Sequence, residues 1–211
     1  MRNAIKQFTL NKIPRIIFVN RGNLKTRMVA LTFDDGPNEN ITERILNILN
    51  DFDIKATFFV TGIKAEQNSK IIKRIYDAGH DIGNHCYSHT KAKGYQFLHI
   101  NNEILKTQLT IKRITGSLPI FFRAPYGSLG LSYFICLFLH SLKYVYWTID
   151  MEDFLPDNHK QVLVKLKSSK IENGDIFLLH DKYQTTVKAL PEIIKSARNS
   201  GFTFGKISKI I

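Results

Sequence analysis

The chain has 211 residues, of which 44% are hydrophobic and 23% charged, and these proportions are typical of a soluble globular domain rather than a disordered chain. Its formal charge of +12 predicts attraction to an anionic partner or surface, although excess lysine can also simply keep a chain soluble. With two cysteines, Cys86 and Cys136, a disulfide framework and a cysteine-rich zinc module are excluded.

The first twenty residues are basic, and lysine, arginine, asparagine and proline interrupt their apolar runs. They lack the continuous apolar core of a signal peptide, so we expect a cytoplasmic protein, with the inner membrane face as a possible peripheral location. We interpret residues 1–27 as a basic N-terminal extension and residues 28–211 as a single domain.

Strand-like apolar runs alternate along the chain with segments of helical spacing. The expected strands, in chain order, are 28–34, 55–62, 80–85, 120–125, 144–150, 174–181 and 202–207. The expected helices are 41–52, 69–79, 100–116, 131–139, 158–174 and 183–201.

Two of these helices have unusual composition. The apolar segment 131–139 is shorter than the roughly 20 residues that span a bilayer, so we expect a buried or interfacial helix there. In the last helix, Pro191 should form the start or a kink. Seven strand–helix alternations at this length predict an α/β fold in one domain, a distorted or incomplete seven-stranded (β/α) barrel.

Ionisable side chains follow five of the expected strands, at the end where the sites of β/α barrels lie. They are Asp34 and Asp35, His85 and His89, Arg123, Asp150 and Asp153, and His180 and Asp181. Chance polar residues would not gather in this way, so the pattern predicts one site at the carboxyl edge of the sheet.

His85 and His89 are four residues apart, so their imidazoles can face the same way if this segment coils like a helical turn. Together with one aspartate they would bind a metal ion and leave a position for water, as in catalytic zinc sites. The second aspartate would remain free as a general base, and spacing does not decide which is which. Two ordinary loop histidines are the alternative. We expect Cys86 to be a packed or partly exposed thiol.

Arg123 is the expected cation of the site, because its guanidinium can make a fork-like contact to a carboxylate, as either a structural or a functional pair. The rigid turn that follows it suits a backbone N–H aimed at an oxyanion. His180 is the expected general acid. Asp150, Glu152 or Asp153 could hold its imidazole charged, and spacing does not choose among the three.

The segments TFDDGP, HCYSH, RAPYG, DMEDF and LLH, in this order, resemble the five motifs of the polysaccharide deacetylases, the NodB-homology carbohydrate esterases of family 4. The resemblance covers roughly residues 28–205. It implies a distorted β/α barrel and removal of N-acetyl groups from N-acetylglucosamine-type residues of an oligo- or polysaccharide. It also implies a divalent metal, zinc in the first place, with Co²⁺, Ni²⁺ or Mn²⁺ as alternatives.

The resemblance also implies a role for each matching residue. Asp34 would be the general base, and Asp35, His85 and His89 would bind the metal. Arg123 would orient the base, and the backbone N–H of Tyr126 would donate to the oxyanion. His180 would be the general acid, Asp153 would tune its pKa, and Leu178 would line the pocket for the acetyl methyl group. One departure is Phe154, where the family usually has tryptophan. Phenylalanine keeps an apolar wall without the indole donor, which leaves pocket shape and substrate choice open.

Other functions fit parts of this pattern. The basic charge and the apolar segment 131–139 would suit a deacetylase or deformylase of a lipid-linked sugar at an anionic membrane surface, and an O-acetyl esterase would use the same residues. A non-catalytic carbohydrate-binding barrel would not need a complete acid, base and ligand set. A nucleic-acid binder rests on charge alone, because the lysines are spread along the chain without a recognisable module, so we expect no nucleic-acid partner.

Overall fold

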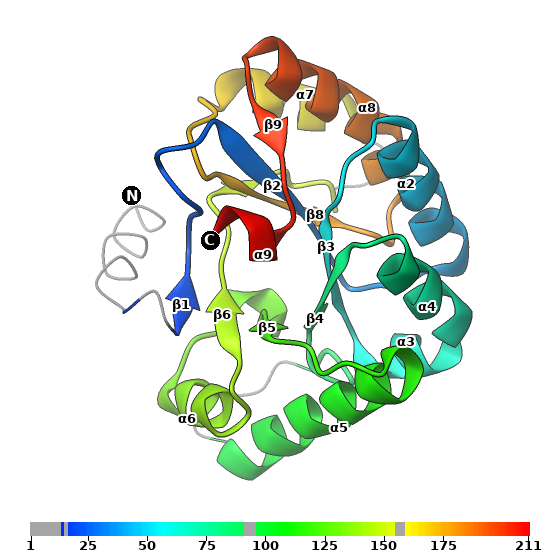
Figure 1. Ribbon diagram of the computed structural model, residues 1–211, viewed down its shortest axis with the longest axis vertical. Coiled ribbons are helices and arrows are strands. Elements are labelled where there is room, and N and C mark those ends of the chain that lie inside the picture. Colours follow the sequence, from blue (N-terminus) through cyan, green and yellow to red (C-terminus); the bar gives the residue numbers. More distant parts are fainter. Residues whose placement is uncertain (1–13, 15–16, 91–95, 155–158) are drawn as a thin grey trace.

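The computed structural model describes residues 14, 17–90, 96–154 and 159–211, and the following account refers to these residues. A parallel sheet curls into an incomplete barrel, and helices cover its outer side (Figure 1). The predicted α/β class and the barrel are therefore confirmed. The strands are β1 (Phe18–Val19), β2 (Met28–Asp34), β3 (Thr57–Val60), β4 (Asp81–Asn84), β5 (Phe121–Phe122), β6 (Lys143–Val145), β7 (Ile149–Asp150), β8 (Ile176–His180) and β9 (Thr203–Phe204).

The helices lie close to their expected positions, with two short additions, α3 and α9. They are α2 (Glu39–Asp51), α3 (Gly62–Gln67), α4 (Ser69–Asp77), α5 (Phe97–Thr115), α6 (Leu131–Leu139), α7 (His159–Ser168), α8 (Gln184–Asn199) and α9 (Ile207–Ile210), with a 3-10 turn, η1, at Pro125–Gly127. Helix α8 begins well before Pro191, which therefore does not start it. In the described part of the chain, no helix is both long enough and apolar enough to span a membrane.

The strands follow the order β1-β6-β5-β4-β3-β2-β8-β7, and β9 pairs with β2 outside this order. Every pairing is parallel. The sheet has nine strands rather than the predicted seven, for two reasons. Phe18–Val19, within the expected N-terminal extension, pairs with β6. The expected strand 144–150 is divided into β6 and β7, which lie near opposite ends of the strand order.

The residues between β6 and β7 cross the open side of the barrel. The N–H of Tyr146 donates to the carbonyl of Val19 in β1 (2.7 Å), and the N–H of Thr148 donates to that of Ile176 in β8 (3.0 Å). Residues 146–148 thus join the two ends of the sheet order. In a regular strand the N–H groups of residues two apart point to the same neighbour, so Tyr146 and Thr148 could not donate to two different strands. This explains why the predicted strand is interrupted.

Apolar layers fill both sides of the sheet. Strands β2 and β8 are almost wholly buried, as expected for central parallel strands covered on both faces. Inside the barrel, side chains from six strands pack against Ile207 and Ile210 of α9, the red helix within the ring of strands in Figure 1. Outside it, α2, α4, α7 and α8 cover one part of the sheet, and α5 and α6 cover another.

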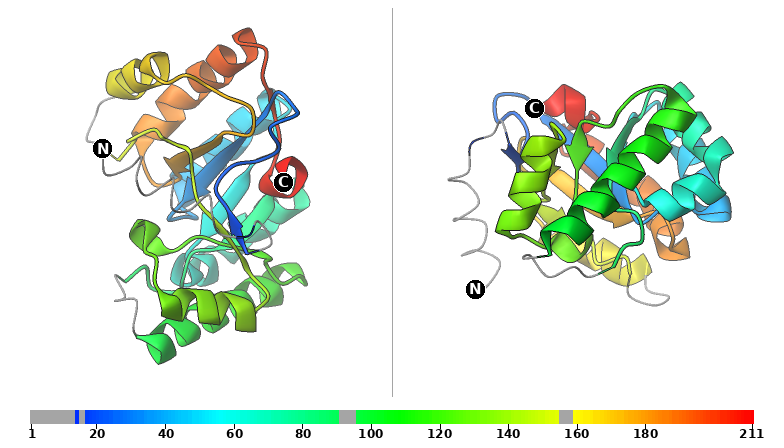
Figure 2. Two further views of the ribbon diagram at one scale, coloured as in Figure 1. Left: turned by 90° about the vertical axis from the view of Figure 1, so that its left-hand side faces the viewer. Right: turned by 90° about the horizontal axis from the view of Figure 1, so that it is seen from below.

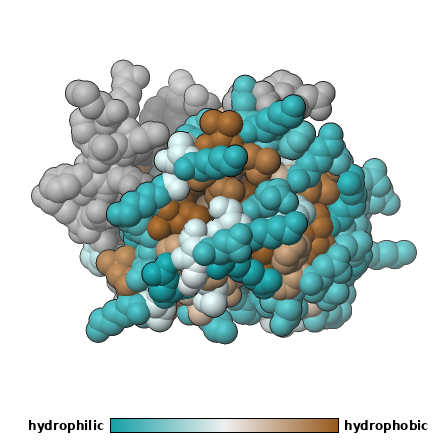
Figure 3. Space-filling view, turned by 90° about the horizontal axis from the view of Figure 1, so that it is seen from above, coloured by the Kyte–Doolittle hydropathy of each residue, from teal (hydrophilic) through white to brown (hydrophobic). Residues whose placement is uncertain are grey.

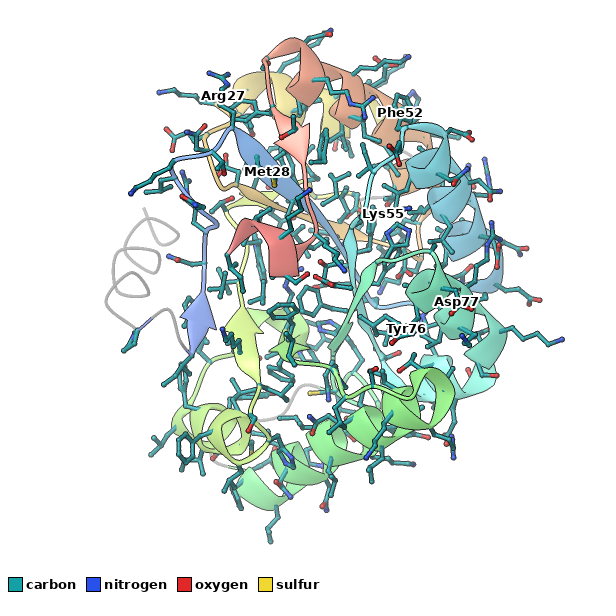
Figure 4. All side chains as sticks on the ribbon, viewed as in Figure 1. Arg27, Met28, Phe52, Lys55, Tyr76 and Asp77 are labelled. Carbon is teal, nitrogen blue, oxygen red and sulfur yellow. The ribbon has the colours of Figure 1, made fainter. Side chains whose placement is uncertain are left out.

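The two ends of the sheet differ in character. Figure 4 labels residues at the amino end, including Arg27 and Met28 at the start of β2, Lys55 before β3, and Tyr76 and Asp77 before β4. At this end Arg27 lies over the ring of Phe202, with 4.7 Å between its Cζ and the ring centroid. The side chains that we expected in the site come instead from the carboxyl ends of the strands or from the loops that follow them, except Leu178, which lies in the middle of β8.

Candidate active site

The adjacent carboxylates at the end of β2 point to different partners because the backbone turns between them. Asp34 is the last residue of β2 and lies in register with His180 of β8. Asp35 has a positive φ of 73°, a left-handed conformation that is uncommon for a residue with a side chain. Both side chains are buried. The repulsion expected between the two charges is thus relieved by separate surroundings.

Asp35, His85 and His89 come together, with one ligand atom from each within 4.8 Å of the others. The Oδ1 of Asp35 lies 3.2 Å from Nε2 of His85 and 2.8 Å from Nε2 of His89. One carboxylate oxygen and two imidazole nitrogens are a donor set that suits zinc and similar divalent cations. These residues therefore fit the metal that the sequence motifs imply.

The segment that carries the histidines is not a helical turn, so that part of the prediction is wrong. Cys86 and His89 have positive φ values of 60° and 57°, and these bends turn both imidazoles toward Asp35. Nδ1 of His85 donates to the carbonyl oxygen of Arg123 (2.6 Å), which leaves Nε2 as the nitrogen for a metal. Cys86 is buried in an apolar cluster, as expected of a packed thiol, and burial raises its pKa.

Lys182 completes the surroundings of Asp35 and was not predicted. Its Nζ lies 2.6 Å from Oδ2 of Asp35, on the carboxylate oxygen that does not face the histidines. Burial alone would raise the pKa of Asp35, but hydrogen bonds and charge from His85 and His89 hold it well below its usual range. Its position in the sequence could have identified Lys182 as a site residue, because it follows His180 and Asp181 at the end of an expected strand.

Arg123 is fully buried and supports Asp34 from behind. Its Nη1 donates to Oδ1 of Asp34 (2.8 Å) and to the hydroxyl of Thr32 (2.7 Å). Its Nε and Nη2 donate to the carbonyls of Val145 (3.1 Å) and Tyr146 (3.3 Å). The predicted fork-like contact, with two guanidinium nitrogens on one carboxylate, is therefore wrong. Only Nη1 binds Asp34, and Nε and Nη2 bind backbone carbonyls. Arg123 therefore does both things that we considered, because it holds the carboxylate of Asp34 and also ties together the backbone behind the site.

His180 is held by Asp153, which settles the choice among three acidic residues. Nδ1 of His180 donates to Oδ1 of Asp153 (2.7 Å), and the backbone N–H of His180 donates to Oδ2 (2.7 Å). The hydroxyl of Thr186 also donates to Oδ2. Glu152 instead pairs with Lys165. Nε2 of the imidazole is thus the nitrogen that can reach a molecule in the adjacent cavity.

These contacts keep the imidazole of His180 charged over a wide pH range. Burial lowers its pKa, but the hydrogen bond and charge of Asp153 outweigh burial, and Asp34 and Asp35 add to this effect, raising the pKa to about 9. A histidine that is protonated at neutral pH can serve as a general acid.

The predicted site residues surround one cavity of about 510 Å³. Its lining comprises Asp34, Asp35, His85, His89, Ala124, Tyr126, Gly127, Trp147, Asp150, Phe154, Leu178, His180, Lys182 and Tyr183. Arg123 and Asp153 contact this lining from behind. Asp181 also lies behind it, fully buried, and burial raises its pKa to about 7.

Aromatic rings form much of the cavity wall. Tyr126 has a positive φ of 58°, and its ring lies against His89 with 4.9 Å between centroids. Phe154 stands edge-on to His180 at 6.0 Å. Trp147, from the segment that crosses the barrel opening, supplies an indole that sequence reasoning missed. The expected role of the Tyr126 N–H as an oxyanion donor stays a prediction.

Comparison with known proteins agrees with this geometry. Residues 21–133 match the family model described as polysaccharide deacetylase. The chain is 32% identical over 184 residues to a peptidoglycan-N-acetylglucosamine deacetylase of Listeria monocytogenes, an alignment that covers 87% of the chain but only 39% of that relative. It is 30% identical over 191 residues to a peptidoglycan-N-acetylglucosamine deacetylase of Bacillus cereus, with 88% of each chain covered.

Solved structures show the same likeness. One is a peptidoglycan N-acetylglucosamine deacetylase bound to a naphthalenyl N-oxidanyl-benzamide, with a TM-score of 0.84, 31% identity and 92% of both chains covered. Another is a CE4 family pseudoenzyme from Bacillus anthracis, with a TM-score of 0.86, 28% identity, and 95% of this chain and 70% of that chain covered. On the sequence match and the shared fold, this chain belongs to the polysaccharide deacetylase family.

Proposed function

We propose that the protein removes N-acetyl groups from N-acetylglucosamine-type residues of an oligo- or polysaccharide in a metal-dependent hydrolysis. The observation that carries this proposal is the convergence of a base, an acid and a three-ligand metal set on one cavity. The family's relatives, named as peptidoglycan deacetylases, support a glycan substrate. Because a pseudoenzyme shares the fold, the argument rests on the residues and not on the fold alone.

Asp35, His85 and His89 are the residues that would hold the divalent cation, with zinc as our first choice. When bound there, the cation would acidify a water molecule and offer positive charge to the acetyl carbonyl. Lys182, on the other oxygen of Asp35, helps to fix that carboxylate in the orientation that the two histidines need.

The chain's own groups then supply the proton transfers. Asp34, held by Arg123, accepts a proton from the attacking water. The N–H of Tyr126 donates to the oxygen that becomes negative as the carbonyl is attacked. His180, held by Asp153, gives a proton to the departing amine through Nε2.

Apolar side chains determine where the acetyl group fits. Leu178, Phe154 and Trp147 line the same cavity as the metal ligands and offer a surface to the methyl group. Trp147 supplies an indole on this wall although Phe154 does not. A sugar with an acetylated nitrogen therefore finds polar groups at its carbonyl and apolar ones at its methyl.

The test is acetate release from N-acetylglucosamine oligomers by purified protein, either zinc-loaded or stripped with EDTA. We expect release that EDTA abolishes and zinc restores. Asp34→Asn should retain one metal per chain but lose turnover, whereas His89→Ala should lose the metal as well. The matched control is Asp77→Asn on the exposed surface of α4, which should behave like the wild type. Full activity in Asp34→Asn would overturn the assignment of the base.

The same assay separates the two acetyl linkages. O-acetylated xylan run in parallel measures esterase activity with the same metal and the same variants. Release from xylan alone would identify an O-acetyl esterase and refute the proposed substrate class.

A further inference from the structure

Helix α6 has an unusual outer surface. Its exposed residues are Leu131, Ile135, Phe138 and Leu139, with 75%, 43%, 79% and 59% of their surface accessible, and the helix has no charged residue. A surface helix normally presents polar side chains to water. An outer face made only of large apolar residues indicates an apolar partner.

Helix α5 extends this surface. Leu98, Leu105 and Leu109 are exposed and recur at spacings of seven and four residues, so they share one side of the helix. The two helices lie side by side, as the right-hand view of Figure 2 shows, and Nε2 of His140 donates to Oδ1 of Asn101 between them (2.8 Å). We call these seven side chains, three from α5 and four from α6, the α5–α6 apolar face.

Lysines accompany this face, since Lys106 and Lys112 are exposed on α5 and Lys143 begins β6, which follows α6 in the chain. Glu103 is the only acidic residue between Ile82 and Ile149, and its carboxylate accepts the N–H groups of Tyr87 and Ser88. Of the seven basic residues in this stretch, Arg123 is buried in the site, Arg113 pairs with Glu66, and Lys91 and Lys93 lie outside the described residues, which leaves Lys106, Lys112 and Lys143 as the described lysines that can meet a partner.

The opposite side of the molecule has a different surface. Seen from above, away from α5 and α6, hydrophilic side chains project over the surface with apolar patches between them (Figure 3). The outer face of α6, by contrast, presents only large apolar residues, and exposed lysines lie nearby on α5. This arrangement matches the surfaces of proteins that lie on membranes, where apolar groups enter the lipid and basic groups meet anionic headgroups.

We propose that the α5–α6 apolar face docks on an anionic phospholipid bilayer. Phe138 and the leucines enter the boundary between headgroups and acyl chains, while lysines such as Lys112 and Lys143 face the lipid phosphates. Helix α6 follows the Tyr126–Gly127 turn of the cavity closely in the chain. Docking would thus hold the cavity close to the membrane surface, where it would meet glycans assembled or anchored there.

The test is flotation of the purified full chain with vesicles, either phosphatidylcholine alone or phosphatidylcholine with an equal amount of phosphatidylglycerol. We expect binding to the anionic vesicles that weakens strongly between 0.1 M and 1 M salt, because the screening length falls from about 10 Å to about 3 Å. Phe138→Glu should weaken this binding by about tenfold or more, because it puts a charge where the exposed ring would enter the lipid.

Matched variants distinguish vesicle binding through this face from non-specific binding to lipid. Val164→Glu alters an exposed apolar residue of α7, away from this face, and should bind vesicles like the wild type. Circular dichroism checks folding, and release of acetate from soluble oligomers should be equal in all three proteins because neither residue lines the cavity. If the wild type released no acetate from soluble oligomers, the proposed function would be refuted, but the result of the vesicle-binding experiment would still stand.

Four outcomes would count against the docking proposal. The wild type could fail to float with anionic vesicles, or Phe138→Glu could float as well as the wild type. Sedimentation could instead show a dimer that Phe138→Glu dissociates, in which case a second copy covers the face. Leu98→Glu on α5 provides an independent variant of the same face, and unchanged binding in that protein would also count against the proposal.

Discussion

The contact between Asp153 and His180 makes a quantitative prediction about pH. Asp153 accepts from both Nδ1 and the backbone N–H of His180, and the hydrogen bond to this carboxylate, followed by its charge, is the main reason why the pKa of the imidazole rises from 6.5 to about 9. That difference corresponds to roughly 3 kcal/mol in favour of the protonated ring. Asp153→Asn keeps the shape and an acceptor oxygen but removes the charge, so the pKa should fall most of the way back.

The assay is kcat/KM for acetate release from pH 5 to 10 with zinc in excess. The wild type should lose activity above about pH 9, whereas Asp153→Asn should lose it above about pH 7, because the acid must be protonated. At pH 8.5 the variant should be at least about tenfold slower, with a smaller deficit at pH 6. Glu152→Gln, which alters the neighbouring pair with Lys165, should leave the profile in place.

Stability provides a second measurement of the same contact. The folded-state pKa of His180 lies above the unfolded value, so its stabilisation is fully present below pH 6.5 and is lost as the pH rises through about 9. Denaturation by urea should therefore show the largest difference between wild type and Asp153→Asn near pH 6 and a smaller one near pH 10. An unchanged alkaline limit in Asp153→Asn would refute the reasoning, because the pKa of His180 would then not depend on this carboxylate.

Three further predictions concern the packing and the metal. In Gly36→Ala, the added Cβ would fall 1.9 Å from Oδ2 of Asp181, so we expect a loss of about 1–3 kcal/mol of stability in thermal melts, partly recovered by adding Asp181→Ala. Arg123→Lys keeps the charge but cannot serve four acceptors, so it should cost about 3 kcal/mol by urea denaturation, whereas the exposed Arg113→Lys should change stability by less than about 0.5 kcal/mol. Zinc at about 100 times its dissociation constant should stabilise the stripped protein by about 2.7 kcal/mol, and an unchanged melting temperature would count against a metal site in the folded state.

Much of the site could be predicted because a parallel barrel sorts its residues by position. The side chains that follow each strand reach the same edge, so sequence order alone grouped Asp34, His85, Arg123 and His180. The helix boundaries were predictable for a similar reason, since apolar periodicity and caps are local. Gly116, for example, ends α5 with a positive φ of 80°, as its place after the apolar run indicates.

The remaining details depend on contacts that sequence spacing does not encode. Two histidines four residues apart fit a helical turn, but Asp35 is reached through left-handed bends at Cys86 and His89. The contact of Lys182 depends on the reach of a long side chain. Strand β1 has two residues, too few for a periodic pattern, and exists because β6 offers a free edge.

Residues 146–148 connect the two edges of a barrel that is otherwise open. Their backbone is tied to β1 at one side and to β8 at the other, and Trp147 between them forms part of the cavity wall. The guanidinium of Arg123 binds the carbonyl of Tyr146 and also the carboxylate of Asp34. A change that breaks the backbone hydrogen bonds of residues 146–148 would therefore widen the cavity. It would also remove part of what holds Arg123 against Asp34. Barrel integrity and catalytic competence should accordingly fail together in this protein.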